Sequence, residues 1–470
     1  MRSRAHLLAG MAALLVAPLA SAQYSWGPAL TSGDTGHPAN WSRVHFDPTN
    51  SNTVWASTGD LPDVFSSDPP EPANGIWRST NGGSTWSQMA SGALDPEHNI
   101  LDFTICKANP DVMYVGTNIY GVFRSTNGGS SWTAANNGIT HDTETFPNAA
   151  WGVGAIVVDP TDPMKVYCSV GQLSGLDIFN LSPDHPGFFY SHDAGQTWTA
   201  NNNGLPPRQD GIGDLVSNTS APLSLAVPED SPNTVYAGLL TAEANIKLLF
   251  GTKARAQTQV FRNTAAGTGT WSDLSSGLPQ IEQASTLGTS LARIAVGAAL
   301  ITVGPAGGNH VVYLSSLGFG IEVSLLAETL KSKSRGIFAL APGSSTWLAR
   351  NNDLPVVNDN LNQNAINTSP VAIHPNDPYI GLTGVVESDV ALPNASKIWA
   401  TTDAGDPWLQ SWGDSGLNQS PTLGQDYCNS LFIEIAPNGS RAVAAIAWTD
   451  PDSLLNLLDD DDGIYMVPAP

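Results

Sequence analysis

The chain has 470 residues, with 19 Lys and Arg against 42 Asp and Glu, so its formal net charge is −23. This length is enough to bury a large core without a metal or disulfide staple, and a composition that is 41% hydrophobic excludes a disordered chain. A surface so acidic repels phosphate, so we expect no nucleic-acid partner. The 45 Gly and 34 Pro residues indicate many tight turns and therefore many short strands.

The first 22 residues have the pattern of an export signal. Arg2 and Arg4 form a positive start, residues 7–19 are apolar, and Ala20-Ser21-Ala22 is an A-x-A cleavage site. The apolar run is short for a bilayer span, so we expect cleavage rather than the alternative, a short membrane anchor. This predicts a secreted or periplasmic protein without a membrane span, in which residues 23–470 form a single domain.

A short motif that ends in tryptophan recurs along the rest of the chain. Its pattern is Ser/Thr-x-Asp/Asn-x-Gly-x-x-Trp, and its four clear and two degraded copies end at Trp86, Trp132, Trp198, Trp408, Trp271 and Trp347. Three strands are predicted upstream of the motif: an apolar strand that ends at a Pro turn, a Val-Tyr or Val-Trp strand, and an aromatic strand. The strand that carries the Trp is the fourth, so each unit is predicted to have four strands. The motif itself is predicted to be a hairpin turn, in which Asp or Asn accepts backbone N–H bonds and Gly supplies a positive φ. The Trp ring is expected between neighbouring sheets.

One further unit lacks the motif. It begins at residues 428–436 and ends at residues 463–467, and residues 24–30 are predicted to supply its missing outer strand. Such closure removes the exposed edges of an open sheet. We therefore predict an all-β protein: a seven-bladed β-propeller of four-stranded antiparallel blades, with the last blade closed by the N-terminal strand. An open solenoid or two separate domains is the alternative.

These boxes and their positions resemble those of the Asp-box (BNR) repeat β-propeller proteins. That superfamily includes sialidases, xyloglucanases and the sortilin ectodomain. The resemblance covers nearly all of residues 23–470 and implies the propeller fold. It leaves the function open, because the members share a scaffold rather than a site.

Propellers place their sites at one mouth of the central channel. The loops leading into each inner strand and those joining the second strand to the third meet there, and they supply carboxylates and aromatic rings. Carboxylates can act as acid and base in glycoside hydrolysis, and aromatic faces stack on pyranose rings. The candidate catalytic residues are Asp142, Glu144, Asp102, Asp426 and Tyr427, and the candidate substrate-binding residues are Trp41, Trp151, Arg43 and Arg293. The alternative is that the acidic loops are simply solvated and keep the protein soluble.

Three of these residues resemble site residues of the sialidase members of the superfamily, which bind a substrate carboxylate with arginines and use a tyrosine nucleophile. The resemblance implies such roles for Arg43 and Arg293, on inner strands of the first and fifth units, and for Tyr427.

An acidic loop near the end of the chain is a candidate metal site. Asp450, Asp452, Asp459 and Asp460 lie in one loop, and oxygen-rich loops suit Ca²⁺, so they are candidate ligands of a structural Ca²⁺ ion. The alternative is a solvated acidic run. We expect no other cofactor. The cysteines Cys106, Cys168 and Cys428 have no metal-ligand spacing, and they are predicted to be buried thiols, with a single disulfide as the alternative.

Two functions remain open on the sequence. The first is a secreted glycan-acting propeller, a glycoside hydrolase that uses the carboxylates of the mouth. The second is a non-catalytic propeller that binds a glycan or an extracellular protein partner on the same rim. We expect a monomer in either case.

Overall fold

The computed structural model describes most of the chain. The described residues are 27–31, 41–58, 75–89, 94, 98, 100–117, 120–139, 152–170, 187–206, 216–246, 253–284, 290–304, 310–324, 328–332, 334–354, 356–359, 363–366, 368–385, 398–403, 405, 407–410, 427–449 and 463–466. Every regular element among them is a β-strand, which agrees with the predicted all-β class. No helix in this part of the chain has the length and apolar character to cross a membrane.

Most strands fall into sets of four that are consecutive in the chain and paired antiparallel, and each set is named here by its first strand. The first four units are β2 (Trp41–Asp47), β3 (Asn50–Thr58), β4 (Ile76–Ser79) and β5 (Ser87–Gln88); β6 (Ile100–Ile105), β7 (Met113–Thr117), β8 (Val122–Ser125) and β9 (Thr133–Ala134); β10 (Val153–Val158), β11 (Val166–Val170), β12 (Gly187–Ser191) and β13 (Thr199–Ala200); and β14 (Val216–Ala226), β15 (Val235–Ile246), β17 (Val260–Asn263) and β18 (Ser272–Asp273).

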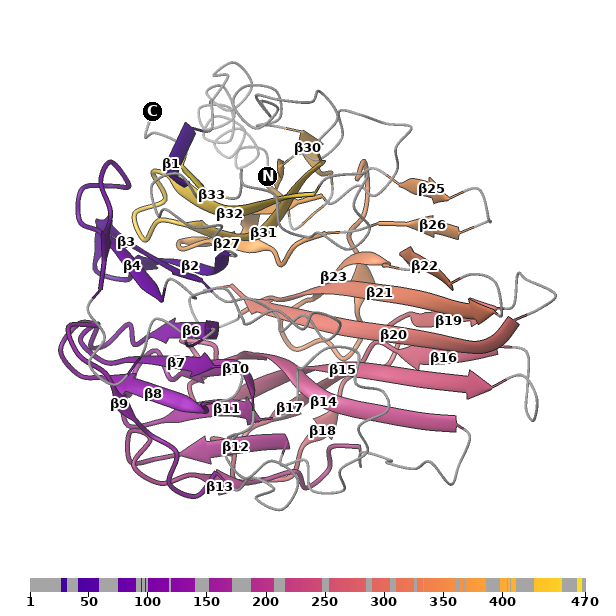
Figure 1. The fold of residues 1–470 in the computed structure, drawn as a ribbon, viewed down its shortest axis with the longest axis horizontal. Coiled ribbons are helices and arrows are strands. Elements are labelled where there is room, and N and C mark those ends of the chain that lie inside the picture. The colour runs from indigo at the N-terminus through magenta and orange to yellow at the C-terminus, as the bar shows by residue number, and fades with distance from the viewer. Residues whose placement is uncertain are drawn as a thin grey trace, which may run out of the picture.

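The later units continue the same order. They are β20 (Ser290–Val303), β21 (Val312–Ser324), β23 (Gly336–Leu340) and β24 (Leu348–Ala349); β27 (Ala372–His374), β28 (Asp377–Gly384), β29 (Ile398–Thr401) and β30 (Leu409–Gln410); and β31 (Tyr427–Ile435), β32 (Ala442–Thr449) and β33 (Gly463–Met466) with β1 (Gly27–Thr31). Figure 1 shows the sheets succeeding one another from the β31 unit through the β2, β6 and β10 units. The arrangement is that of a β-propeller.

The two ends of the described chain pair with each other. β1 runs antiparallel to β33, with Gly27 opposite Met466 and Thr31 opposite Gly463. The predicted closure of the last unit by an N-terminal strand is therefore present, and the predicted start of that strand at residue 24 lies outside the described residues. Closure leaves β33 with a partner on both sides and so protects the edge on which the unit would otherwise end.

The repeated motif forms the hairpin turn that its residues predict. The Oγ of Ser79 accepts the N–H of Gly83 at 2.8 Å and donates to Oδ1 of Asn81 at 3.0 Å, and the same Oδ1 accepts the N–H of Thr85 at 2.9 Å. Gly83 has a φ of 85°, which favours glycine. The turns around Asn127 and Asp193 repeat these bonds, so turn chemistry accounts for the motif.

In four units the tryptophan after the turn links its unit to the preceding one. The indole N–H groups of Trp198, Trp271, Trp347 and Trp408 donate to the backbone carbonyls of Ala135, Asn201, Leu274 and Arg350, at 2.7, 3.1, 2.7 and 2.7 Å. Each of these carbonyls belongs to the third residue after the tryptophan of the unit before. All four rings are at most 4% exposed. The predicted burial of the ring between sheets is confirmed, and the bond adds a directional link between them.

Two of the three cysteines are buried free thiols. Cys106 and Cys168 pack in one apolar cluster between the β6 and β10 units. Burial raises the pKa of both thiols, which makes them poor nucleophiles. The Cys428 side chain lies outside the described residues.

The β14 and β20 units depart from the regular pattern. The extra residues of these two units lengthen their strands. β15 pairs with β17 through Gly238 and then with β20 from Leu240 to Ile246, so the two units share one sheet. β21 likewise pairs with β23 and then with β22 (Glu328–Ser332). The long strands project to the right in Figure 1.

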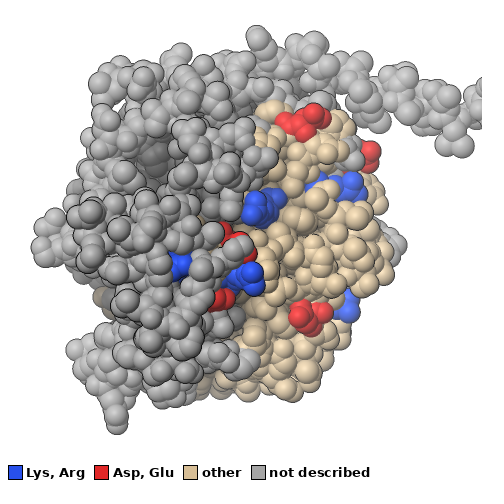
Figure 2. Space-filling view, turned by 90° about the vertical axis from the view of Figure 1, so that its right-hand side faces the viewer, with Lys and Arg blue, Asp and Glu red and all other residues tan. Residues whose placement is uncertain are grey.

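A two-stranded ribbon covers one face of this projection. Its strands are β16 (Lys253–Gln257) and β19 (Gln280–Ala284). A second, separate ribbon pairs β25 (Val357–Asp359) with β26 (Gln363–Ala365). Ala254, Ala256 and Ile281 of the first ribbon pack against Ala295 of β20. Figure 2 views the molecule from this end and shows Lys and Arg side chains close to Asp and Glu side chains. The described part of this face is therefore of mixed charge.

The link between units predicts a large effect of removing one indole. We expect Trp271→Ala to lower the free energy of unfolding by about 3–5 kcal/mol, because it empties a buried site and removes the bond to Asn201. Trp86→Ala is the matched control, because Trp86 is only partly buried and its indole bonds to Gly83 of its own turn. Denaturant unfolding followed by circular dichroism measures both. Equal losses in the two variants would contradict the role of the link.

Candidate functional site

The innermost strands of the units surround a central channel of about 520 Å³. Its wall is formed by residues of β2, β6, β10, β14, β20, β27 and β31 and by the turns that follow them. Most wall residues are apolar, because each inner strand also faces its neighbours. The charged side chains that break this apolar wall are Arg43, His45, Asp102, Lys107, Glu229 and Glu434.

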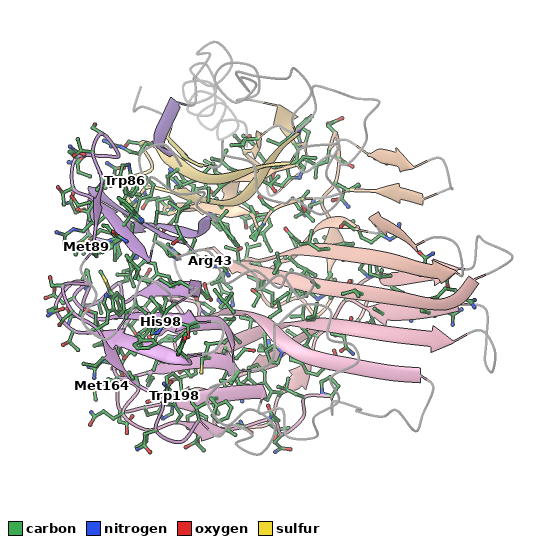
Figure 3. All side chains as sticks on the ribbon, viewed as in Figure 1. Arg43, Trp86, Met89, His98, Met164 and Trp198 are labelled. Carbon is green, nitrogen blue, oxygen red and sulfur yellow. The ribbon has the colours of Figure 1, made fainter. Side chains whose placement is uncertain are left out.

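The channel brings together two residues that the sequence singled out separately. Nε of Arg43 donates to Oδ1 of Asp102 at 2.5 Å, joining β2 to β6. The guanidinium carbon also lies 3.8 Å from the ring centroid of Phe432 on β31, a cation–π contact. Arg43 lies near the middle of the molecule (Figure 3). The predicted catalytic carboxylate and the predicted anion-binding arginine thus satisfy each other in this structure.

The Asp102 carboxylate has two further donors. Its Oδ1 accepts the N–H of Phe103 at 2.9 Å, and its Oδ2 accepts the N–H of Ile156 on β10 at 2.7 Å. Asp102 is 8% exposed. One carboxylate therefore holds three neighbouring inner strands, and in this geometry its oxygens are used for positioning rather than directed at an open space. Its role in catalysis stays a prediction.

A second charged pair joins the first and last units along the chain. Nδ1 of His45 lies 3.1 Å from Oε2 of Glu434, and the same oxygen accepts the N–H of Phe46 at 3.0 Å. Burial lowers the pKa of His45, but the charge and hydrogen bond of Glu434, helped by Asp102, outweigh it, so the pKa is raised above 6.5. Sequence reasoning missed this pair. The available signal was a glutamate inside the apolar run Phe432–Ile435.

A third pair lies at the exposed end of the wall. Nζ of Lys107 is 2.6 Å from Oε2 of Glu229, and both side chains are about half exposed, at 51% and 47%. Exposed pairs contribute little to stability, because water and salt screen the charges. This pair therefore affects the charge at this end of the channel more than the stability of the propeller.

Arg293 is placed differently from the prediction. It lies on β20, within the stretch that pairs with both β15 and β21, and it is 0% exposed. It is absent from the channel wall. None of its three guanidinium nitrogens has a hydrogen-bond partner among the described residues. A guanidinium cannot discharge itself by losing a proton, so this burial is costly. Burial away from the channel wall does not fit the predicted role of Arg293 in binding a substrate.

A partly buried hydrogen-bonded set lies away from the channel. Nδ1 of His310 is 2.7 Å from Oδ1 of Asp230, and its Nε2 is 2.8 Å from the hydroxyl of Tyr236. Tyr236 is 4% exposed, and burial raises its pKa. The equivalent hydroxyl of Tyr313 donates to the carbonyl of Pro378 in the next unit, at 2.7 Å. The set therefore occupies a structural position between units.

The other sequence-predicted site residues cannot be placed. Trp41 and Tyr427 are the first residues of β2 and β31, but their side chains lie outside the described residues. The remaining predicted residues lie outside them altogether: Asp142, Glu144, Asp426, Trp151, Asp450, Asp452, Asp459 and Asp460. Within the described part of the chain, no group of three or more His, Cys, Asp or Glu could hold a metal ion. The Ca²⁺ site stays a prediction.

Comparisons with known proteins give one sequence match and several structural ones. No family model matches the chain. A stretch of 88 residues, 19% of this chain, is 32% identical to a xyloglucanase of Hypocrea jecorina (strain QM6a), and it covers 9% of that enzyme's length. YCF48 bound to a D1 peptide is similar over 96% of both chains, at 11% identity and a TM-score of 0.44. The GH74 enzyme of Niastella koreensis is similar over 87% of this chain and 64% of its own, at 14% identity and a TM-score of 0.33.

The raised pKa of His45 predicts a pH-dependent contribution to stability. The pKa is higher in the folded chain than its ordinary value of 6.5, so the stabilisation is complete below about pH 6.5 and is lost as the pH rises through the raised value. We expect the stability difference between wild type and His45→Gln to shrink from about pH 6 to about pH 9. Thermal unfolding across this range measures it. A difference that grows with pH would contradict the pairing with Glu434.

The unpartnered Arg293 predicts a stabilising substitution. We expect Arg293→Met to raise the free energy of unfolding by about 1–4 kcal/mol, because a flexible apolar chain replaces a buried charge that has no partner among the described residues. Arg255→Met, at a pair with Glu282 where the arginine is 53% exposed, should change it by less than about 1 kcal/mol. Denaturant unfolding compares the two. Destabilisation by Arg293→Met would mean that a counter-charge holds the guanidinium.

Proposed function

We propose that the chain is an exported Asp-box β-propeller of seven blades that acts on glycans as a glycoside hydrolase. The observation that carries this is the 88-residue stretch that is 32% identical to a xyloglucanase, a protein named for its action on xyloglucan. The hydrolytic groups are the predicted carboxylates of the mouth, Asp142, Glu144 and Asp426, with Trp41 and Trp151 as stacking residues. The substrate class is a β-glucan of the xyloglucan type.

The channel has a supporting role in this proposal. Arg43, Asp102, His45 and Glu434 bind one another and the backbone of neighbouring inner strands. They hold together neighbouring inner strands, into which the mouth loops lead. Precise placement of reacting groups depends on such rigid support, because a displacement of about 1 Å at a reacting group costs orders of magnitude in rate.

A second function is favoured by the state of Asp102. This is the one predicted catalytic carboxylate whose side chain lies within the described residues, and an arginine and two backbone N–H groups occupy it. A propeller whose carboxylates are all used in this way binds a glycan or an extracellular protein partner without cleaving it.

Hydrolysis of purified xyloglucan by residues 23–470 tests the proposal. We expect new reducing ends, and a loss of about 10²–10⁴-fold in rate in Asp142→Asn or Asp426→Asn, because each removes a group that transfers a proton. Asp111→Asn, in the turn that precedes β7, is the matched control and should retain full activity. Binding of xyloglucan without cleavage would favour the second function. If the chain neither binds nor cleaves any glycan, both glycan functions are refuted.

A further inference from the structure

Three aromatic rings form a column in the β6 unit that ends in solvent. Phe123 of β8 is 4% exposed, and the ring centroid of His98 lies 5.1 Å from it at an interplanar angle of 38°. Tyr120 also stacks on His98, with centroids 3.9 Å apart and an angle of 29°. His98 is 9% exposed and Tyr120 is 38% exposed. A surface ring is thus backed by two buried ones.

Hydrogen bonds fix the backbone that carries Tyr120. Its N–H donates to Oγ1 of Thr117 at 3.0 Å, and its carbonyl accepts from Nδ2 of Asn136 at 3.0 Å. The next residue, Gly121, has a φ of 77°, and a Cβ there would meet the Asn136 side chain at 2.4 Å. The tight turn therefore depends on glycine. A ring held this firmly loses little conformational freedom when a ligand stacks on it.

Tyr120 and His98 belong to the two kinds of loop that form the mouth of a propeller. His98 lies just before β6, an innermost strand, and Tyr120 lies between β7 and β8 (Figure 3 labels His98). In the β6 unit the connection between the second and third strands is residues 118–121. The corresponding connections are longer in three other units: residues 59–75 in the β2 unit, 171–186 in the β10 unit and 385–397 in the β27 unit. The connection in the β6 unit is therefore the shortest of these four in sequence.

The chemistry of the column points to one class of ligand. An isolated exposed tyrosine is ordinary on a protein surface, but one stacked on a buried imidazole offers a flat, rigid and uncharged face. Among the described residues the cation–π contacts of arginines are with Phe432 and Trp55, and none is with Tyr120, which suits an uncharged ligand. The C–H face of a neutral pyranose ring matches this surface in size and polarity.

We propose that Tyr120, backed by His98, is a stacking subsite for a neutral pyranose residue of a glycan chain at the mouth. This inference rests on the proposed glycan-binding function and deepens it. Tyr120 touches the sugar, and His98 is a positioning residue that keeps the tyrosine ring flat and in place.

Binding of xyloglucan and of cello-oligosaccharides by calorimetry and affinity electrophoresis tests the subsite. Tyr120→Ala should weaken binding about tenfold, and Tyr120→Phe should bind within about twofold of wild type, because the ring face is retained. The matched control is Tyr379→Ala. Tyr379 is 46% exposed and stands at the start of β28, next to the turn at the opposite end of its unit. It should bind as wild type does.

The outcomes separate this inference from the proposed function. Wild-type affinity in Tyr120→Ala, or an equal loss in Tyr379→Ala, overturns the subsite while glycan binding stands. A wild-type chain that binds no glycan overturns both. His98→Leu gives an independent test of the positioning role. On its own it should weaken glycan binding, but the double variant Tyr120→Ala/His98→Leu should bind glycan as well as Tyr120→Ala alone. Fully additive losses of affinity in the double variant would contradict the positioning role.

Discussion

The fold depends on how each sheet is held to the one before it. A buried indole crosses from the outer strand of one unit to a backbone carbonyl of the preceding unit, and the pattern recurs at Trp198, Trp271, Trp347 and Trp408. A ring of apolar sheets can slide, because apolar packing has little direction. The indole bond sets both the distance and the register between sheets, since it pairs one N–H with one carbonyl.

The backbone beside the ring strengthens this link. The backbone N–H groups of Trp198 and Trp271 donate to the backbone carbonyls of Asn137 and Asn203, which also belong to the preceding unit. At the centre of the molecule charged side chains have a similar effect, with Asp102 joining β2, β6 and β10, and Glu434 joining β31 to β2. Outer and inner links together therefore tie these successive sheets to one another.

The periodic part of the structure was accessible from the sequence because each unit repeats the same local physics. A serine, an asparagine and a glycine at fixed spacing specify a turn, and the tryptophan that follows has to be buried. The pairing of β1 with β33 could be predicted because one unit lacked an outer strand and the chain had a spare one. Such inferences need only local rules and a count of strands.

The parts that break the repeat were not accessible in this way. The pairing of β15 with β20 joins segments with no shared motif, so nothing local indicates that the inserted residues would lengthen strands. Arg293 was correctly assigned to an inner strand, but the extension carries it away from the channel. The His45–Glu434 pair depends on the register between the first and last units, which a repeat pattern does not reveal.

The most direct test of the central claim is hydrogen exchange in a Trp198→Phe variant. This substitution keeps an aromatic ring and removes the indole donor to Ala135. The account predicts faster exchange in both sheets that the bond joins, at β8 and β9 of the preceding unit as well as at β12 and β13 of its own. Faster exchange confined to β12 and β13 would contradict it, because the indole would then stabilise only its own sheet.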